Sequence, residues 1–489
     1  LDRLASQSVR FERAFAPYGV CAPARHAIIT GQYPPTNGAG AMRTWKRTSA
    51  IKDITDPELL AIPVYEATPP NPDVRCFPQF LRAAGYYCTN NAKEDYQFRS
   101  FPSIWDESSR RAHYSNRMPS QPFFAVFNQE VTHESRVHKT TSPRVTDPAT
   151  VPLPPYYPDT DTVRRDVARH YDNIVALDAW VGQMLAELEA SGEADNTIVF
   201  FYGDHGDGLP RHKRWVYDSG TRVPLLVRWP DGQGAGMVDT QLVSFVDFAP
   251  SLLALAGLPL PDYLEGQDFL SENRPPARTH VFAFRDRMDP APETIRAVRD
   301  HRYQYVRNYR PELPYLGYLP YRDRVAMMAD IHRGIEDGTL GAEQWQFWAK
   351  TKPLEELYDT ETDPHQVRNL AADPAHFTKL AELRKALADF QARHTDLNLL
   401  PDAEVVARLW GADGKQPVTE VPELGPVLNL HGRIATFLMK PGTSIIWRPV
   451  GETRWRLFGA GGIHEKYGSF EAQAWRIGWQ ASAVVTFER

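Results

Sequence analysis

One short stretch near the start of the chain places a cysteine where it could act as a nucleophile. In the sequence VCAPARHAIITG, Cys21 lies close to Pro23 and Arg25, directly before an apolar run that predicts a short helix. A nucleophile or a bound oxyanion at a helix start is stabilised by free backbone N–H groups and by the helix dipole. Arg25 lies one turn further on, so it can hydrogen-bond to the nucleophile or to an anion. The alternative is a buried cysteine before a proline turn.

Three polar clusters elsewhere in the chain each follow an apolar run that predicts a strand. They are NNAKED, VTHESR and GDHGDG, which contain Lys93, His133, Asp204 and His205. In sheets of parallel strands, the chemistry collects at the carboxyl ends of the strands. The position of these clusters therefore indicates a functional site.

The elements that must position these residues alternate between strand and helix over residues 1–270. The strands are apolar on both faces, which predicts an α/β fold with a mostly parallel central sheet flanked by helices. The clearest helix spans residues 163–190, where apolar residues recur at helical spacing. The segment LDRLASQSV predicts a short helix at the start of the chain.

The pattern changes from about residue 280, where the sequence predicts antiparallel strands and a helix at residues 376–393. After a polar linker, short alternating strands over residues 426–489 predict a small β-sandwich, and this segment resembles the fibronectin-like or chitobiase-like modules of some bacterial enzymes. We therefore expect an α/β catalytic domain over residues 1–275, an antiparallel subdomain over residues 276–410 and a terminal sandwich over residues 426–489.

Length and composition restrict the class of protein. A chain of 489 residues suggests several domains. A net charge of −6 argues against a nucleic-acid partner, which usually requires a basic patch. The absence of an apolar run of about 18 residues predicts no membrane span. Cys21, Cys76 and Cys88 allow either one special thiol and a pair, or three buried free thiols.

Five segments of the chain carry a family resemblance. CAPAR followed by Thr30 and Gly31 resembles the C-x-P-S/A-R…T-G signature of the type I sulfatases, which belong to the alkaline phosphatase superfamily. GDHGDGLPRHKRWVYDSGTRVP resembles the second signature block of that family. The segments LDRLASQSVRFERAFAP, LVSFVDFAPSLLALAGL and ELYDTETDPHQVRNLA resemble further blocks. They follow the family order and cover most of residues 1–395, which implies the alkaline phosphatase/sulfatase-like fold.

The resemblance implies a modified nucleophile. In type I sulfatases the signature cysteine is oxidised to formylglycine, and the modifying enzyme recognises the C-x-P-x-R core. The aldehyde hydrates to a gem-diol, one hydroxyl attacks sulfur, and the other later expels sulfate as the aldehyde re-forms. Cys21 is the matching residue, so a formylglycine-generating enzyme is an expected partner.

The resemblance also implies a metal site formed by Asp204, His205 and the modified Cys21. We expect Ca²⁺, because carboxylate oxygens suit a hard cation, with Mg²⁺ or Mn²⁺ as alternatives. The other role for Asp204 is a helix cap or turn. The positions that match the family motifs imply catalytic roles for five residues. These roles are nucleophilic attack, sulfate binding and protonation of the leaving alcohol, and the residues are Cys21, Arg25, Lys93, His133 and Lys213.

Three neighbouring residues are expected to bind substrate. Asp95 stands where the family has a second histidine, so it could orient Lys93 or bind a sugar hydroxyl. Arg136 and His212 lie beside matched residues and are further candidates.

One family feature is absent from the printed sequence. The family's first strand carries a pair of aspartates that bind the metal, and no Asp-Asp pair occurs in this chain. The start at Leu1 suggests a processed, truncated or incomplete sequence. Without that strand we expect weak metal binding and poor activity, unless a neighbouring segment fills the gap.

The leading hypothesis is a periplasmic or secreted sulfatase that hydrolyses sulfate esters of a sulfated carbohydrate. The first alternative is a phosphonate monoester or phosphodiester hydrolase of the same superfamily. The second is a catalytically silent protein that binds sulfated glycans, which the missing ligands motivate.

Overall fold

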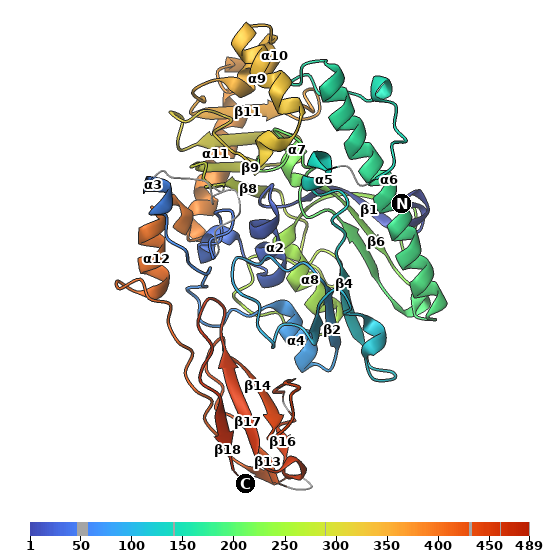
Figure 1. The fold of residues 1–489 in the computed structure, drawn as a ribbon, viewed down its shortest axis with the longest axis vertical. Coiled ribbons are helices and arrows are strands. Elements are labelled where there is room, and N and C mark those ends of the chain that lie inside the picture. The colour runs from blue at the N-terminus through green and yellow to red at the C-terminus, as the bar shows by residue number, and fades with distance from the viewer. Residues whose placement is uncertain (46–56, 140–141, 289, 430–432, 460, 489) are drawn as a thin grey trace.

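The computed structural model describes residues 1–45, 57–139, 142–288, 290–429, 433–459 and 461–488. A large α/β body carries a smaller all-β part that projects from one end (Figure 1). None of the described helices has the length and apolarity needed to cross a membrane.

The first sheet of the body has the strand order β5-β6-β1-β7. Its strands are β1 (Val9–Phe15), β5 (Val199–Tyr202), β6 (Arg222–Arg228) and β7 (Val238–Ser244). The α/β class is confirmed, but this sheet is mixed, because β6 runs antiparallel to both β1 and β5. The expected N-terminal helix is shorter than LDRLASQSV: α1 covers Asp2–Ser6, and Val9 already pairs with Val227.

The second sheet has the order β3-β2-β4 and is parallel throughout. It consists of β2 (Tyr87–Asn91), β3 (Glu107–Ser108) and β4 (Phe123–Phe127). Helix α4 (Phe77–Ala83) precedes β2 and packs against it, with Cys76, Phe77 and Cys88 in one buried cluster.

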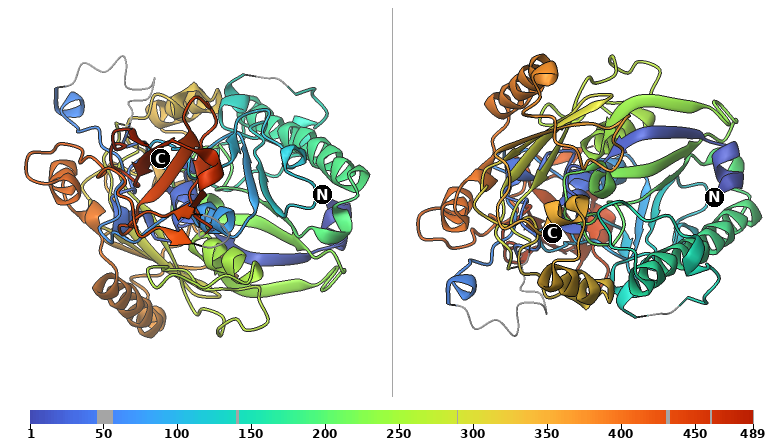
Figure 2. Two further views of the ribbon diagram at one scale, coloured as in Figure 1. Left: turned by 90° about the horizontal axis from the view of Figure 1, so that it is seen from below. Right: turned by 90° about the horizontal axis from the view of Figure 1, so that it is seen from above.

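Helices cover these two sheets. Helix α2 (Cys21–Thr30) lies in the centre of the body and ends at Gly31, whose φ of 69° suits glycine at a helix C-terminus. Helix α6 (Asp161–Ala190) runs along one side (Figure 2) and is capped by the Thr160 hydroxyl, which accepts from the Val163 N–H. The other helices of this part are α3 (Pro57–Leu60), α5 (Ser135–His138), α7 (Asp218–Thr221) and α8 (Phe248–Leu255).

A third sheet, of order β11-β10-β9-β8, is antiparallel. Its strands are β8 (Val281–Arg285), β9 (Ile295–Arg299), β10 (Tyr303–Asn308) and β11 (Glu355–Asp359). Helix α11 (Phe377–Arg393) packs on β9 and β10 and contributes Leu383 and Phe390 to the main core. The nearby helices are α9 (Met327–Asp337), α10 (Ala342–Trp345) and α12 (Asp402–Trp410).

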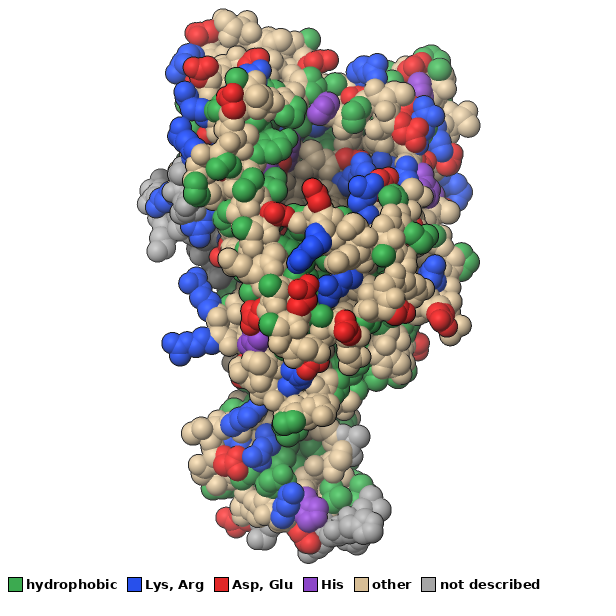
Figure 3. All heavy atoms as spheres, turned by 90° about the vertical axis from the view of Figure 1, so that its right-hand side faces the viewer, with side chains coloured by type: hydrophobic (Ala, Val, Ile, Leu, Met, Phe, Trp, Pro, Cys, Tyr) green, Lys and Arg blue, Asp and Glu red, His purple; other side chains and the backbone are tan. Residues whose placement is uncertain are grey.

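The C-terminal part contains two small antiparallel sheets and projects from the body in the space-filling view (Figure 3). One has the order β12-β13-β16, with β12 (Leu428–Asn429), β13 (Arg433–Ala435) and β16 (Ile463–His464). The other has the order β15-β14-β17-β18, with β14 (Ser444–Pro449), β15 (Arg456–Leu457), β17 (Phe470–Trp475) and β18 (Val485–Phe487). The division into three domains remains a prediction.

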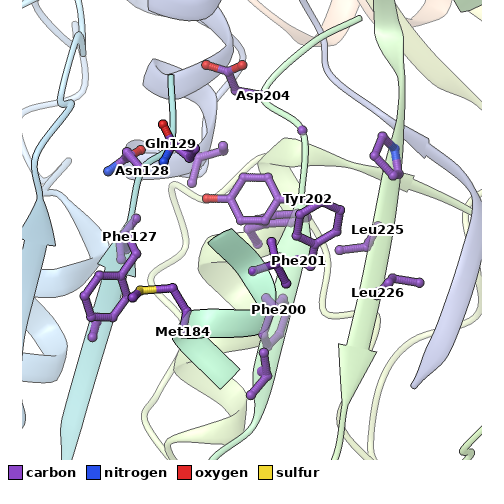
Figure 4. A pocket seen from close by; sticks show the side chains of 18 of the residues that line it. Phe127, Asn128, Gln129, Met184, Phe200, Phe201, Tyr202, Asp204, Leu225 and Leu226 are labelled. Carbon is purple, nitrogen blue, oxygen red and sulfur yellow. The ribbon is translucent and has the colours of Figure 1, made fainter. Parts of the chain in front are cut away.

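A cleft separates the first two sheets. Among the described strands, β4 pairs only with β2 and β5 pairs only with β6, so each has an open edge. A cavity of about 1800 Å³ lies along both strands, and Leu177, Trp180 and Met184 of α6 also line it. Figure 4 shows Phe127 of β4 and Phe200–Tyr202 of β5 on its walls. Both strands are apolar enough to be core strands, yet every residue in them is only half-buried.

Candidate active site

Cys21 is the first residue of α2 and is completely buried. Its thiol is among the groups that lower the pKa of the nearby Asp95 carboxylate, which receives hydrogen bonds from Nε and Nη2 of Arg43 at 3.2 and 3.1 Å. Burial would raise the pKa of Asp95, but the charge and hydrogen bonds of Arg43 outweigh burial and lower it. Asp95 therefore lies as a carboxylate beside the predicted nucleophile. All three cysteines are free thiols, so the alternative of a disulfide pair is wrong.

The carboxyl ends of β4 and β5 meet at Arg25. Its Nε donates to Asp204 Oδ2 and its Nη1 donates to Asn128 Oδ1, both at 2.8 Å. Asn128 directly follows β4, and Asp204 lies two residues after β5, so Arg25 bridges the cleft at this end. Lys93 Nζ lies 3.9 Å from Asp204 Oδ2, and His205 Nε2 lies 3.7 Å from Asp204 Oδ1. We call these five residues the Asp204 side of the site.

Electrostatics make Asp204 an ionised carboxylate among positive groups. Burial would raise its pKa, but His205, Arg25 and Lys93 hold it well below the usual range. The pKa of His205 is lowered to about 4 by burial, assisted by the charge of Lys213 and Lys93, so its imidazole is neutral. A neutral imidazole and a carboxylate are both able to ligate a cation.

A second group of residues lies around Lys213. Its Nζ is 3.3 Å from Glu134 Oε2 and 3.4 Å from His133 Nε2. Glu134 also accepts two hydrogen bonds from Arg214, at 3.0 and 2.8 Å, and its side chain is fully buried. Burial and the positive charges of Lys213 and Lys93 lower the pKa of His133 to about 2. In this arrangement its imidazole is therefore neutral and does not carry the second ring proton. An anion bound between the two lysines would raise that pKa.

The loop that carries Lys213 is held by Asp207. The Asp207 carboxylate contacts His212 Nδ1 at 2.8 Å, and its backbone C=O accepts from the Lys213 N–H at 3.0 Å. His212 Nε2 lies 2.6 Å from the Tyr156 hydroxyl. Both ring nitrogens of His212 are therefore engaged, and its contacts position the neighbouring Lys213. The Lys213 side of the site consists of His133, Glu134, Asp207, His212, Lys213 and Arg214.

Arg136 is the predicted site residue that the structure leaves apart. It lies in α5, and its side chain is half-buried. No hydrogen bond between described residues links its guanidinium to either side of the site; its backbone N–H donates to the His133 C=O at 2.7 Å.

The residues described do not by themselves suit a divalent cation. Ca²⁺ takes six to eight oxygen ligands, and Asp204 is the carboxylate available on this side. Within the described ranges, no group of three or more His, Cys, Asp or Glu side chains converges as a metal site. Arg25 and Lys93 instead place positive charge against Asp204, so further acidic ligands would be needed to hold a cation here.

Comparison with known proteins agrees with this arrangement. A sequence model of the family described as "Sulfatase" matches residues 1–258, and one described as "N-sulphoglucosamine sulphohydrolase, C-terminal" matches residues 208–318. A protein of Formosa agariphila named "Ulvan-active sulfatase" is 39% identical, over 99% of this chain and 86% of its own length. This chain belongs to the sulfatase family. The sulfatase is accordingly a sulfuric ester hydrolase, of a family that typically uses formylglycine and a divalent metal.

More distant relatives share the fold of this sulfatase. Human N-sulphoglucosamine sulphohydrolase is 25% identical over 80% of this chain and 84% of its own length. The structure of BT4656 with its substrate D-glucosamine-2-N,6-O-disulfate matches 82% of this chain and 93% of its own, with a TM-score of 0.57 and 17% identity. A phosphonate monoester hydrolase from Silicibacter pomeroyi matches 81% of this chain and 91% of its own, with a TM-score of 0.55 and 17% identity. These two structural matches show the alkaline phosphatase-like fold alone.

Sequence reasoning did not single out two residues that hold the candidate site together. Asn128 is one of them, although it is a polar residue at the end of an apolar run, which is the signal used for the other clusters. Asp207 was within GDHGDG, but nothing in the spacing predicts that it holds both His212 and the Lys213 backbone. Glu134, which lies within VTHESR next to His133, is fully buried against Arg214 and Lys213.

Proposed function

We propose that this sulfatase removes sulfate from a sulfated carbohydrate through a formylglycine formed from Cys21. The observation that carries the proposal is the convergence of Arg25, Lys93 and the Lys213–His133 pair at the carboxyl ends of three strands, near the start of α2. Such fixed cations stabilise a sulfuryl group in the transition state. Because the relative from Formosa agariphila is named an ulvan-active sulfatase, we infer that the substrate of this enzyme is a sulfated polysaccharide.

Different residues of the chain would carry out the successive steps of sulfate ester hydrolysis. Lys93, Lys213 and Arg25 would bind the sulfate oxygens. One hydroxyl of the gem-diol at position 21 would lose its proton to the neighbouring Asp95 carboxylate and form the new S–O bond, and the bond to the sugar oxygen would break. The sugar oxygen then takes a proton, which His133 would supply directly or through water after the bound sulfate has raised its pKa and made it an imidazolium. The second hydroxyl loses its proton as the C–O bond to sulfate breaks and the aldehyde re-forms.

The substrate-binding roles are proposals of different weight. Asp95, held by Arg43 beside Cys21, is close enough to contact the nucleophile or a sugar hydroxyl. Arg136 keeps its proposed role at the rim of the site. For His212 the geometry favours positioning of Lys213 over direct substrate contact, because Asp207 and Tyr156 occupy both ring nitrogens.

A divalent metal completes the proposal, with Ca²⁺ preferred over Mg²⁺ and Mn²⁺. Asp204, His205 and the modified Cys21 would contribute ligands, and the cation would supply Lewis acidity toward a sulfate oxygen. The missing carboxylates would come from an extended segment in the cleft between β4 and β5. The two open strand edges and the apolar walls support this, because a strand there would satisfy unpaired backbone groups and cover apolar surface.

Two further proposals concern the protein partner and the cellular location. A formylglycine-generating enzyme would act on the CAPAR segment. The family resemblance favours a periplasmic or secreted protein, where sulfated polysaccharides are accessible.

Phosphonate monoester or phosphodiester hydrolysis is the second candidate, because a phosphonate monoester hydrolase matches this fold nearly as well as BT4656 does. The third is a silent glycan-binding protein, motivated by the incomplete ligand set. The fixed cations of the site would bind a sulfate ester and a phosphate ester alike. Only a measurement of turnover therefore distinguishes the three candidate functions.

The deciding experiment measures kcat/KM on an aryl sulfate and a matched aryl phosphodiester, with the protein co-expressed with a formylglycine-generating enzyme. We expect the sulfate to be preferred and Cys21→Ala to lower kcat by on the order of 10⁴-fold or more, as for loss of other nucleophiles. The matched control is Cys88→Ala, another buried free thiol, which should keep activity. A preference for the phosphodiester would favour the second candidate, and anion binding without turnover the third.

A further inference from the structure

A groove of about 720 Å³ lies at the junction between the C-terminal sheets and the α/β body. Residues 454–457, which include β15, form one wall. Residues around α4, β2 and β3 form the other, among them Arg82, Glu94 and Trp105. In Figure 1 the C-terminal sheets lie directly below α4 and β2. The volume falls within the range typical of small-ligand sites.

The two walls are fixed relative to each other. The Trp475 ring of β17 stacks on Phe101 of the body at 5.7 Å, with an angle of 8° between the ring planes. The hydroxyls of Ser103 and Ser444 also hydrogen-bond at 2.6 Å. Because both contacts join the same two parts of the chain, the groove is preformed rather than created by a bound ligand.

The groove contains hydrogen-bond donors that no described residue satisfies. Arg82 Nε and Arg456 Nη1 are buried and have no partner among the described residues. The nearby Asp106 carboxylate is already used, by Arg82 Nη2 at one oxygen and the Cys88 N–H at the other, both at 2.9 Å. Unpaired buried donors favour a ligand rich in acceptor oxygens.

The same wall presents an aromatic ring and further positive charge. Trp455 lines the groove, and the Arg448 guanidinium lies 4.4 Å from the centre of its ring, which holds the ring in place. Arg454 is exposed at the groove. An indole ring offers an apolar surface to the C–H face of a sugar, and guanidinium groups match sulfate and carboxylate oxygens.

One segment of the chain links the groove to the candidate active site. Glu94 lines it, and the preceding residue, Lys93, lines the large cavity and lies 3.9 Å from Asp204. A saccharide chain that enters the active site with one sugar could therefore continue along the groove with its neighbours.

We propose that this groove is a distal subsite for an anionic saccharide, which binds further units of the sulfated chain whose end sugar lies at Cys21. The subsite rests on the proposed function for its ligand class. It makes the enzyme selective for oligosaccharides over small sulfate esters, because the extra contacts are available only to a longer substrate.

The test compares kcat/KM for ulvan oligosaccharides with kcat/KM for an aryl sulfate. The variants are Arg454→Ala and Trp455→Ala, and the control is Trp479→Ala, another tryptophan of the C-terminal part that lies against an arginine but does not line the groove. We expect each groove variant to raise KM for the oligosaccharide by about tenfold, the equivalent of about 1.4 kcal/mol. The aryl sulfate parameters and the control should stay unchanged.

Binding of the same oligosaccharides, measured by calorimetry on the unmodified protein, separates this proposal from the proposed function. Weaker binding in the groove variants supports the subsite even if no substrate turns over. Binding and KM within twofold of the parent protein in both variants would overturn it, as would an equal loss on the aryl sulfate.

Discussion

The two sides of the candidate site differ in how completely their charges are satisfied. On the Lys213 side, Glu134 faces both Lys213 and Arg214, and Asp207 fixes His212 and the backbone of Lys213. On the Asp204 side, one carboxylate faces Arg25, Lys93 and His205 at the mouth of an open cleft.

This difference shows which half of the site the described chain builds alone. The Lys213 side is completed by two described segments, the loop at residues 207–214 and residues 133–134, so ion pairs and hydrogen bonds among described residues fix the cation that would bind sulfate. The Asp204 side depends on strands that do not pair with each other, β4 and β5, and therefore on whatever occupies the space between them.

The strongest test of this comparison is metal binding on the Asp204 side. Calorimetric titration of the 489-residue chain with Ca²⁺ should show binding no tighter than about 10⁻³ M, the weak end of protein calcium sites, because Asp204 is the carboxylate available there. The variant Asp204→Asn should abolish even that binding. A micromolar dissociation constant that requires Asp204 would show that the described residues are sufficient to bind Ca²⁺. The Asp204 side would then be as complete as the Lys213 side.

The next largest effect concerns stability on the Lys213 side. Replacing Glu134 by Gln leaves Arg214 and Lys213 buried without their carboxylate, so the free energy of unfolding should fall by about 3 kcal/mol or more at pH 7. The matched control is Glu361→Gln, which removes an exposed partner of Arg302 and should change stability by less than about 1 kcal/mol.

The same variant tests a pH dependence. Burial would raise the pKa of Glu134, but Arg214 and Lys213 lower it to about 2. A lowered pKa means that Glu134 stabilises the fold fully above its unfolded pKa, near 4.5, and loses this contribution as pH falls toward 2. Chemical denaturation of both proteins should therefore show their difference shrinking below pH 4.5. A constant difference would mean that the charge of Glu134 is not its source.

The smallest expected effect sharpens the role of His212. His212→Phe removes both hydrogen bonds, to Asp207 and Tyr156, and should lower kcat by about tenfold through displacement of Lys213. His212→Asn can keep the bond to Asp207, so it should recover part of the loss. The control is His376→Phe, whose partner Asp373 lies far from the site in the sequence and has a side chain that is 44% exposed. A rise in KM with unchanged kcat would instead favour direct substrate contact.

Much of the fold follows from patterns along the chain. The helix predicted at residues 163–190 is α6, and that predicted at 376–393 is α11, because both carry an apolar stripe at helical spacing. The N-terminal helix was extended too far because Val9 continues the apolar spacing of Leu1 and Leu4. In the structure Val9 pairs with Val227, a partner that is distant in sequence and that no local pattern predicts.

For the candidate site, the sequence by itself determined which residues could do chemistry. A cysteine at a helix start and polar clusters after apolar strands are local features, and they indicated Cys21, Lys93, His133, Asp204 and His205, whereas Lys213 came from the family resemblance. Only the tertiary structure decided how they are held, because Arg25 reaches Asn128 and Asp204 across long stretches of chain. Ion pairs, burial and the open cleft between β4 and β5 are properties of packed elements, and a one-dimensional pattern does not contain them.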